Sequence, residues 1–245
     1  MVIDFDRVKL MPRPILCCLL LLSVATATGC AQTKTLTRSE GNRPPLAGAR
    51  VLLMPADIEL YELTVGGLPE PKADWTASAR IHVAAALREE LTQRKAALIF
   101  YQPPRSDPPK EYAHTQLVKL HDVVGGAILT HQMGMGPSLP TKEGAFDWSL
   151  GQGTAVLRED FGADYGLFLF VRDSYAGAGR TAMMALAAAG GVVVPGGRQI
   201  GFASLVDLKS GNILWFNWLM SGTGDLRDAE PARSTVRSLL ADFPS

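Results

Sequence analysis

Cysteine is scarce in this chain of 245 residues, and all of it lies near the amino terminus. Cys17 and Cys18 belong to an apolar run, and Cys30, the third and last cysteine, follows that run closely. A domain built from the residues after Cys30 has no disulfides and must be held by its apolar core. A lone exposed thiol is a liability in an oxidising compartment, which favours a chemical role for Cys30 over a spare thiol.

The sequence also lacks net charge, because its 24 Lys and Arg residues balance 24 Asp and Glu residues. No global field therefore points to nucleic acid or to anionic lipid as a partner. With 47% hydrophobic residues, the composition is typical of a packed α/β domain and argues against disorder. After the amino-terminal run, no segment has the roughly 20 consecutive apolar residues that a membrane-spanning helix needs.

Motifs that specify a reaction or a cofactor are missing as well. The chain has no Gly-x-Ser-x-Gly, no His-Glu-x-x-His and no complete dinucleotide or phosphate loop. His114 and His121 are two helical turns apart, too far to share one metal ion without help, since zinc–nitrogen bonds are ~2 Å long. Together with His131 they are predicted to be surface or helix-capping histidines. The sequence predicts no metal, no cofactor and no enzymatic activity.

The first thirty residues have the features of an export signal. A basic segment with Arg7, Lys9 and Arg13 precedes an apolar run from Ile15 to Ala25, and small residues then lead to Cys30. The run is too short to span a membrane comfortably and fits the apolar region of a secretory signal peptide, about 7–15 residues long. We therefore predict a signal peptide over residues 1–29.

Two cleavage sites compete within this signal. Ala27-Thr28-Gly29-Cys30 resembles a bacterial lipobox, although Ala27 stands where Leu is usual. The resemblance implies that Cys30 carries diacylglycerol and palmitate, and several acyl chains anchor a protein stably. Because Ala31 rather than Asp follows Cys30, the resemblance also implies that the protein is located on the periplasmic face of the outer membrane. The alternative is cleavage after Ala25-Thr26-Ala27, which would release a soluble periplasmic protein.

The rest of the chain alternates apolar strands with amphipathic helices. We predict a lipidated flexible tether over residues 30–48, because this segment is polar and contains Pro44 and Pro45. Residues 49–245 are predicted to form a periplasmic domain. The expected class is α/β, with one mixed β-sheet, helices packed on it and a C-terminal β-hairpin followed by a helix. Strands are predicted over 50–55, 58–65, 97–101, 165–171, 199–208 and 212–220, and helices from Asp74, over 112–131, 156–161 and 181–189, and after Asp228.

The hairpin carries the most specific local signal. Asp207 can accept hydrogen bonds from the turn amides, Gly211 can supply a positive φ, and Trp215 can pack across the sheet. Ala163-Asp164-Tyr165 before an apolar strand, followed by this hairpin, resembles a group of envelope α/β domains. The group includes the curli-secretion lipoprotein family and the amino-terminal domain of the TolB translocation protein. The resemblance implies a scaffold or binding module rather than an enzyme. The sequence has no pair of long amphipathic strands like those that form a membrane barrel, so it does not predict a pore.

Two segments are candidate partner interfaces. Trp215, Phe216 and Trp218 place large side chains on both faces of one strand, which predicts either an open interface or a central strand covered on both sides. The apolar segment from Met183 to Val194, which includes Met184, is either a membrane-touching or partner-binding element or a buried helix and turn. The expected partners are a membrane, through lipid on Cys30, and envelope proteins or a second copy of the chain, but no nucleic acid.

Taken together, these features predict a non-enzymatic outer-membrane lipoprotein. Its periplasmic domain is expected to bind a protein or to self-assemble in envelope assembly, transport or maintenance. The alternative is a soluble periplasmic binding module released by ordinary signal peptidase.

Overall fold

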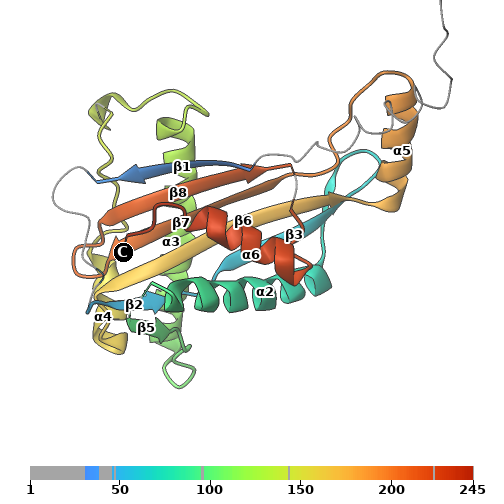
Figure 1. Ribbon diagram of the computed structural model, residues 1–245. Coiled ribbons are helices and arrows are strands. Elements are labelled where there is room, and N and C mark those ends of the chain that lie inside the picture. Colours follow the sequence, from blue (N-terminus) through green and yellow to red (C-terminus); the bar gives the residue numbers. More distant parts are fainter. Residues whose placement is uncertain are drawn as a thin grey trace, which may run out of the picture.

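The computed structural model describes residues 31–38, 46, 48–94, 97–142, 144–222 and 224–244. The predicted signal peptide and the predicted lipidation site Cys30 lie outside these residues. Within them, one mixed sheet carries helices on both faces (Figure 1), which confirms the predicted α/β class. The hairpin near the carboxyl terminus and the helix after it are also present as predicted.

The sheet has the strand order β1-β8-β7-β6-β2-β5, and β3 pairs with β6 and with β4. Its parallel pairs are β2 with β5 and β6 with both β2 and β3, whereas β1, β8, β7 and β6 run antiparallel in turn. The strands are β1 (Gln32–Thr37), β2 (Arg50–Leu53), β3 (Asp57–Leu63), β4 (Pro69–Pro71), β5 (Ala97–Phe100), β6 (Tyr165–Ala176), β7 (Gln199–Asp207) and β8 (Ile213–Ser221).

Two separate cores lie on the two faces of this sheet. Residues of α2 and α6 fill the first core, and residues of α3 and α4 fill the second. A further helix, α5, stands at one end of the long strands, away from both cores (Figure 1). The helices are α2 (Ala73–Thr92), α3 (Pro108–Gln132), α4 (Ala155–Phe161), α5 (Ala178–Ala189) and α6 (Ala229–Leu239), and short 3-10 turns cover Pro140–Lys142 and Gln152–Thr154.

Strand β6 is central, as its continuous apolar run predicted. Leu167, Leu169 and Val171 face the core beneath α2 and α6, and Phe168 faces the core beneath α3. The strand continues past the predicted end at Val171 to Ala176. Its first residues pair with β2 and its later residues with β3, so the sheet extends well beyond the short strands β2 and β5.

The hairpin between β7 and β8 has the expected turn chemistry. The Asp207 carboxylate accepts a hydrogen bond from the Lys209 amide at 2.8 Å, and Gly211 has φ +77°. Asp228 occupies the predicted N-cap position of α6, although its side chain makes no capping hydrogen bond. Asp74 does not cap α2, because that helix begins at Ala73 and leaves Asp74 in its first turn.

The described part of the predicted tether differs from expectation. Gln32–Thr37 form the edge strand β1, which pairs antiparallel with β8 from Gln32 opposite Met220 to Thr37 opposite Trp215. Short polar residues such as these can complete a sheet edge, because main-chain hydrogen bonds rather than side-chain burial hold an edge strand. The flexible tether predicted for this stretch is therefore wrong, and the chain is fixed to the sheet directly after Ala31.

Candidate functional site

Two of the predicted interface residues are core residues. Trp215 and Phe216 are both fully buried, Trp215 in the core beneath α6 and Phe216 in the core beneath α3. The edge of Phe243 meets the Trp215 ring at a centroid distance of 5.1 Å. Strand β8 is therefore covered on both faces at these two residues, which is the second of the two predicted alternatives, and neither side chain forms an open interface. Trp218 is half-buried and packs at the margin of the second core.

The remaining interface candidates, Met183 and Met184, lie half-buried on α5. This helix has the reverse of the usual burial pattern. Its one buried residue is Arg180, the one charged residue among its twelve, while Leu186 is 76% exposed. No residue of α5 belongs to either core of the described chain. An apolar helix whose apolar side chains are left uncovered is typical of an element that contacts another molecule.

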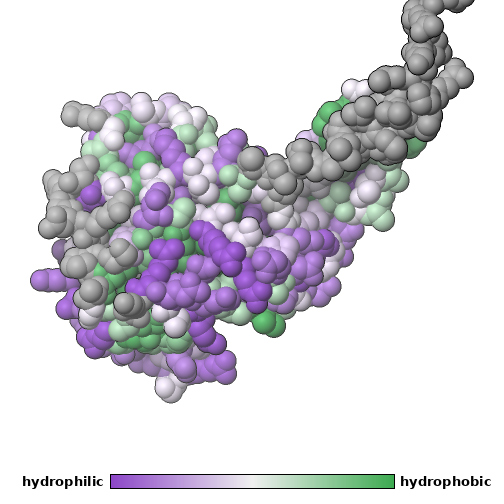
Figure 2. All heavy atoms as spheres, viewed as in Figure 1, coloured by the Kyte–Doolittle hydropathy of each residue, from purple (hydrophilic) through white to green (hydrophobic). Residues whose placement is uncertain are grey.

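Two other segments join α5 at this end of the molecule. We call the combined structure, residues 63–69 and 177–198, the arm. Exposed apolar residues gather on it, as Figure 2 shows on the projecting part of the molecule. They are Val65 (55% exposed), Leu68 (71%), Leu186 (76%), Val192 (57%) and Val193 (93%).

The buried guanidinium of Arg180 holds the three segments of the arm together. It donates to the carbonyl of Pro195 from Nη2 at 2.8 Å and from Nε at 3.1 Å, and to the carbonyl of Val65 at 3.5 Å. Gly177 is the N-cap residue of α5, and its amide donates to the carbonyl of Leu63 at 3.1 Å, which ties the start of the helix to the end of β3. The arm is therefore held by hydrogen bonds to backbone rather than by an apolar core of its own.

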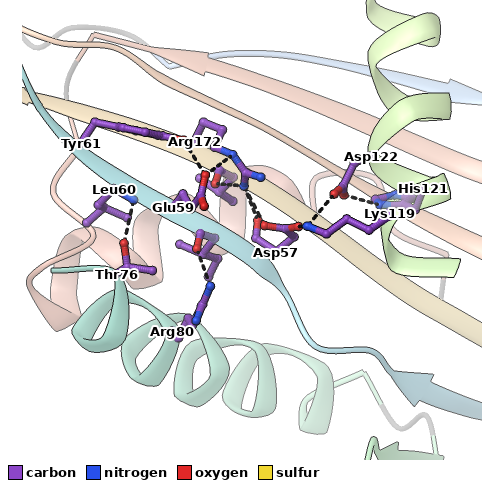
Figure 3. Close-up of polar contacts among 12 residues, drawn as sticks. Asp57, Glu59, Leu60, Tyr61, Thr76, Arg80, Lys119, His121, Asp122 and Arg172 are labelled. Atoms are coloured by element: carbon purple, nitrogen blue, oxygen red, sulfur yellow. Dashed lines mark hydrogen bonds and ion pairs between the residues drawn. The ribbon is translucent and has the colours of Figure 1, made fainter. Parts of the chain in front are cut away.

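A cluster of charged side chains lies elsewhere in the molecule, where β6 stops pairing with β2 and begins to pair with β3 (Figure 3). Asp57 Oδ1 lies 2.9 Å from Arg172 Nη1 on β6, and its Oδ2 lies 2.5 Å from Lys119 Nζ on α3. Burial raises the pKa of Asp57, but hydrogen bonds from Lys119 and Asp122 and the charge of Arg172 outweigh burial and lower the pKa to about 2. This cluster fastens α3 to the sheet.

Beside this cluster, a hydroxyl, an imidazole and a carboxylate lie next to one another. His121 Nε2 is 2.9 Å from Ser204 Oγ, and its Nδ1 is 3.8 Å from Asp122 Oδ1. The second distance exceeds hydrogen-bond range, and the Ser204 side chain is fully buried. Burial lowers the pKa of His121, which keeps the ring neutral. The Ser204 hydroxyl is therefore enclosed by the protein, where it is a hydrogen-bond partner of the His121 ring.

The histidines of α3 differ from the prediction in part. His114 and His121 share one face of the helix, but each is only 1% exposed, so their assignment to the surface is wrong. His114 Nε2 lies 3.1 Å from Asp160 Oδ2, and its Nδ1 lies 3.3 Å from the Tyr101 hydroxyl. His131 Nδ1 lies 2.8 Å from the carbonyl of Pro137. Across the described ranges, no group of three or more His, Cys, Asp or Glu side chains is arranged to hold a metal ion.

A second buried carboxylate lies where β6 and β7 approach the arm. Asp173 accepts hydrogen bonds from the Tyr175 hydroxyl at 2.5 Å and from Gln199 Nε2 at 2.6 Å. Burial raises the pKa of Asp173 to about 6 in spite of these bonds. The Tyr175 hydroxyl in turn accepts from the Leu226 amide at 2.8 Å, which ties the loop before α6 to the sheet.

Sequence patterns did not indicate Asp57, Arg172, Asp173 or Ser204 as polar contacts. Each lies in a strand whose neighbours come from distant parts of the chain, so no local spacing brings its partners together. The arm had a visible signal, because residues 181–197 carry no charged side chain. Among the helices that the structure describes, none is long and apolar enough to cross a membrane.

Comparison with known proteins adds little to this geometry. No family model matches the chain, and no curated protein matches it. Among solved structures, the PelC dodecamer from Paraburkholderia phytofirmans is 13% identical, with a TM-score of 0.36, over 86% of this chain and 96% of that chain. A variant of the same dodecamer is 15% identical, with a TM-score of 0.36, over 88% of this chain and 99% of that chain. A TM-score this low transfers neither fold nor function to this chain.

Proposed function

We propose that this chain is a non-enzymatic lipoprotein of the bacterial outer membrane, anchored through acyl chains on Cys30. Its periplasmic domain acts by contact with other molecules, as a protein-binding or self-assembling module in envelope assembly, transport or maintenance. The observation that carries the proposal is the reversed burial pattern of α5, with Arg180 buried and Leu186 exposed. The exposed apolar side chains of this helix pack in neither core of the described residues, which supports a role in intermolecular contact.

The sequence supports both the lipid anchor and the location in the outer membrane. Ala27-Thr28-Gly29-Cys30 supports lipidation, and Ala31 after the cysteine supports sorting to the outer membrane. The resemblance of the hairpin to the curli-secretion and TolB group supports a binding role. Within the described residues, strands β1, β4 and β5 each pair with one neighbour only, so their outer edges offer further main-chain groups for a partner strand.

A second candidate function is a soluble periplasmic binding module. It is favoured by Ala25-Thr26-Ala27, a small-x-small cleavage site that would give a mature chain beginning at Thr28. The two candidates differ in one covalent modification, so a test of acylation separates them.

Metabolic labelling with an alkyne analogue of palmitate provides this test. The wild-type protein is expected to be labelled and Cys30→Ser to be unlabelled. Cys18→Ser, which removes a cysteine of the apolar run, is the matched control and should be labelled like the wild type. Absence of label from the wild type contradicts the anchor and favours the soluble alternative, and label that persists in Cys30→Ser contradicts Cys30 as the site of the anchor.

A further inference from the structure

Apart from Arg180 and Arg198, the arm carries no charged side chain. Residues 63–69 and residues 181–197 contain no Asp, Glu, Lys or Arg. They contain no aromatic residue either. The exposed apolar residues of the arm are all valine or leucine, and such side chains are suited to contact with the acyl region of a bilayer.

The size of the arm is suited to the surface of a bilayer rather than to its interior. Helix α5 has 12 residues, a length of about 18 Å at ~1.5 Å per residue. The hydrocarbon core of a membrane is about 30 Å thick, so the helix can lie in the interfacial layer but cannot span it. Its exposed residue Leu186 and the neighbouring exposed Val193 would lie in the acyl region there.

The path of the chain points to the same end of the molecule. Gln32 begins β1 opposite Met220 and lines a cavity of about 410 Å³ together with Leu63 and Pro195 of the arm. Cys30 precedes Gln32 by two residues. An extended chain covers at most about 3.6 Å per residue, so Cys30 is held within about 7 Å of Gln32. Acyl chains on Cys30 therefore enter the bilayer beside the arm.

We propose that the arm lies in the surface layer of the membrane that holds the acyl chains of Cys30, with Val65, Leu68, Leu186, Val192 and Val193 in contact with lipid. This inference rests on the proposed lipid anchor and adds an orientation to it. A lipid and an apolar surface fixed to the same end of one sheet form two attachments, and two attachments restrict the tilt of the domain. The hairpin at Lys209, at the opposite end of β7, then points away from the membrane.

Single cysteines with spin labels test this placement, because the mature lipoprotein has no free thiol once the sulfur of Cys30 is bonded to diacylglycerol. Labels are placed by Leu186→Cys and Val193→Cys, with Lys209→Cys and Val123→Cys as controls. Val123 is a matched control, since it is apolar and 70% exposed but lies on α3. The acylated protein is reconstituted in vesicles of phosphatidylethanolamine and phosphatidylglycerol, and collisions with oxygen and with a water-soluble nickel complex are measured by electron paramagnetic resonance.

The expected result is a ratio of oxygen to nickel collisions several-fold higher at positions 186 and 193 than at 123 and 209. Equal ratios at all four positions overturn the proposal. Protection from both reagents at 186, with a short distance between labels on two molecules, also overturns it and identifies a second copy as the occupant.

Failure of the anchor itself gives a different result. If the purified protein carries no acyl chain, the proposed function fails, and the arm is tested with that protein by flotation on the same vesicles. Binding that drops at least several-fold in Leu186→Glu but not in Val123→Glu supports lipid contact. Absence of binding, or equal loss in both variants, overturns the arm's role in the membrane.

Discussion

Gly125 of α3 and Phe202 of β7 are in such close contact that a Cβ on Gly125 would lie 2.1 Å from Cε2 of the ring. The next residue, Gly126, has no atom within 4 Å of the corresponding position. Adjacent glycines in one helix therefore have different roles. Gly125 allows α3 to approach the sheet, and Gly126 contributes only its unfavourable helix propensity.

Replacing these glycines by alanine should change stability in opposite directions. Gly125→Ala forces Phe202 or the helix to move, and we expect the free energy of unfolding to fall by about 1–3 kcal/mol. Gly126→Ala, the matched control, should raise it by up to about 1 kcal/mol, because alanine favours the helix. Urea unfolding followed by circular dichroism measures both changes. A stabilised Gly125→Ala protein would contradict the close contact.

The buried carboxyl of Asp173 should make the protein less stable as the pH rises through the weakly acidic range. Its folded pKa of about 6 lies above the ordinary value of 3.8, so between these values the folded state binds more protons than the unfolded state. The free energy of unfolding is expected to lose up to about 3 kcal/mol from this group between pH 4 and pH 6. Asp173→Asn should remove this component in unfolding curves measured across that range. An unchanged pH profile would show that Asp173 titrates normally.

Asp57 should have the opposite effect at lower pH. Its folded pKa of about 2 lies below the ordinary 3.8, so its contribution is present above pH 4 and is lost as the pH falls from about 4 to 2. Asp57→Asn should flatten the acid limb of the stability profile by about 2 kcal/mol. Glu70→Gln, at an exposed residue of β4 outside this cluster, is the control and should leave the limb steep. Identical acid limbs in both variants would argue against the ion cluster.

The pairing of Ser204 with His121 should matter for stability and not for catalysis. Ser204→Ala leaves His121 Nε2 buried without the hydroxyl that it contacts at 2.9 Å, which is expected to cost about 1–3 kcal/mol of unfolding free energy. Release of nitrophenol from short-chain nitrophenyl esters should stay at the uncatalysed rate in both wild type and variant. Hydrolysis by the wild type that disappears in both Ser204→Ala and His121→Gln would establish a hydrolase instead.

Local signals in the sequence were sufficient for most of the fold. The alternation of apolar strands and amphipathic helices predicted the class, and the turn residues Asp207 and Gly211 predicted the hairpin. Helix propensity gives no reason for Gly125 in the middle of α3, because the reason is Phe202, which approaches from 77 residues away in the chain. Strand β1 was missed because its polar residues resemble those of a linker and its order comes from pairing with β8.

The candidate interfaces, too, were predictable from the sequence only in part. An aromatic-rich strand does not reveal whether one or two of its faces are covered, and helices from both sides of the sheet bury Trp215 and Phe216. The apolar segment from Met183 to Val194 was recognisable by composition. Its position beside the start of β1 depends on the topology of the whole sheet, which no local pattern contains.

The attachment of lipid to Cys30 is tested most directly by the mass of the amino-terminal peptide of the mature protein, isolated from native envelope. The account predicts a peptide that begins at Cys30 and carries the added mass of diacylglycerol and a further fatty acid. An unmodified peptide that begins at Thr28 would contradict it.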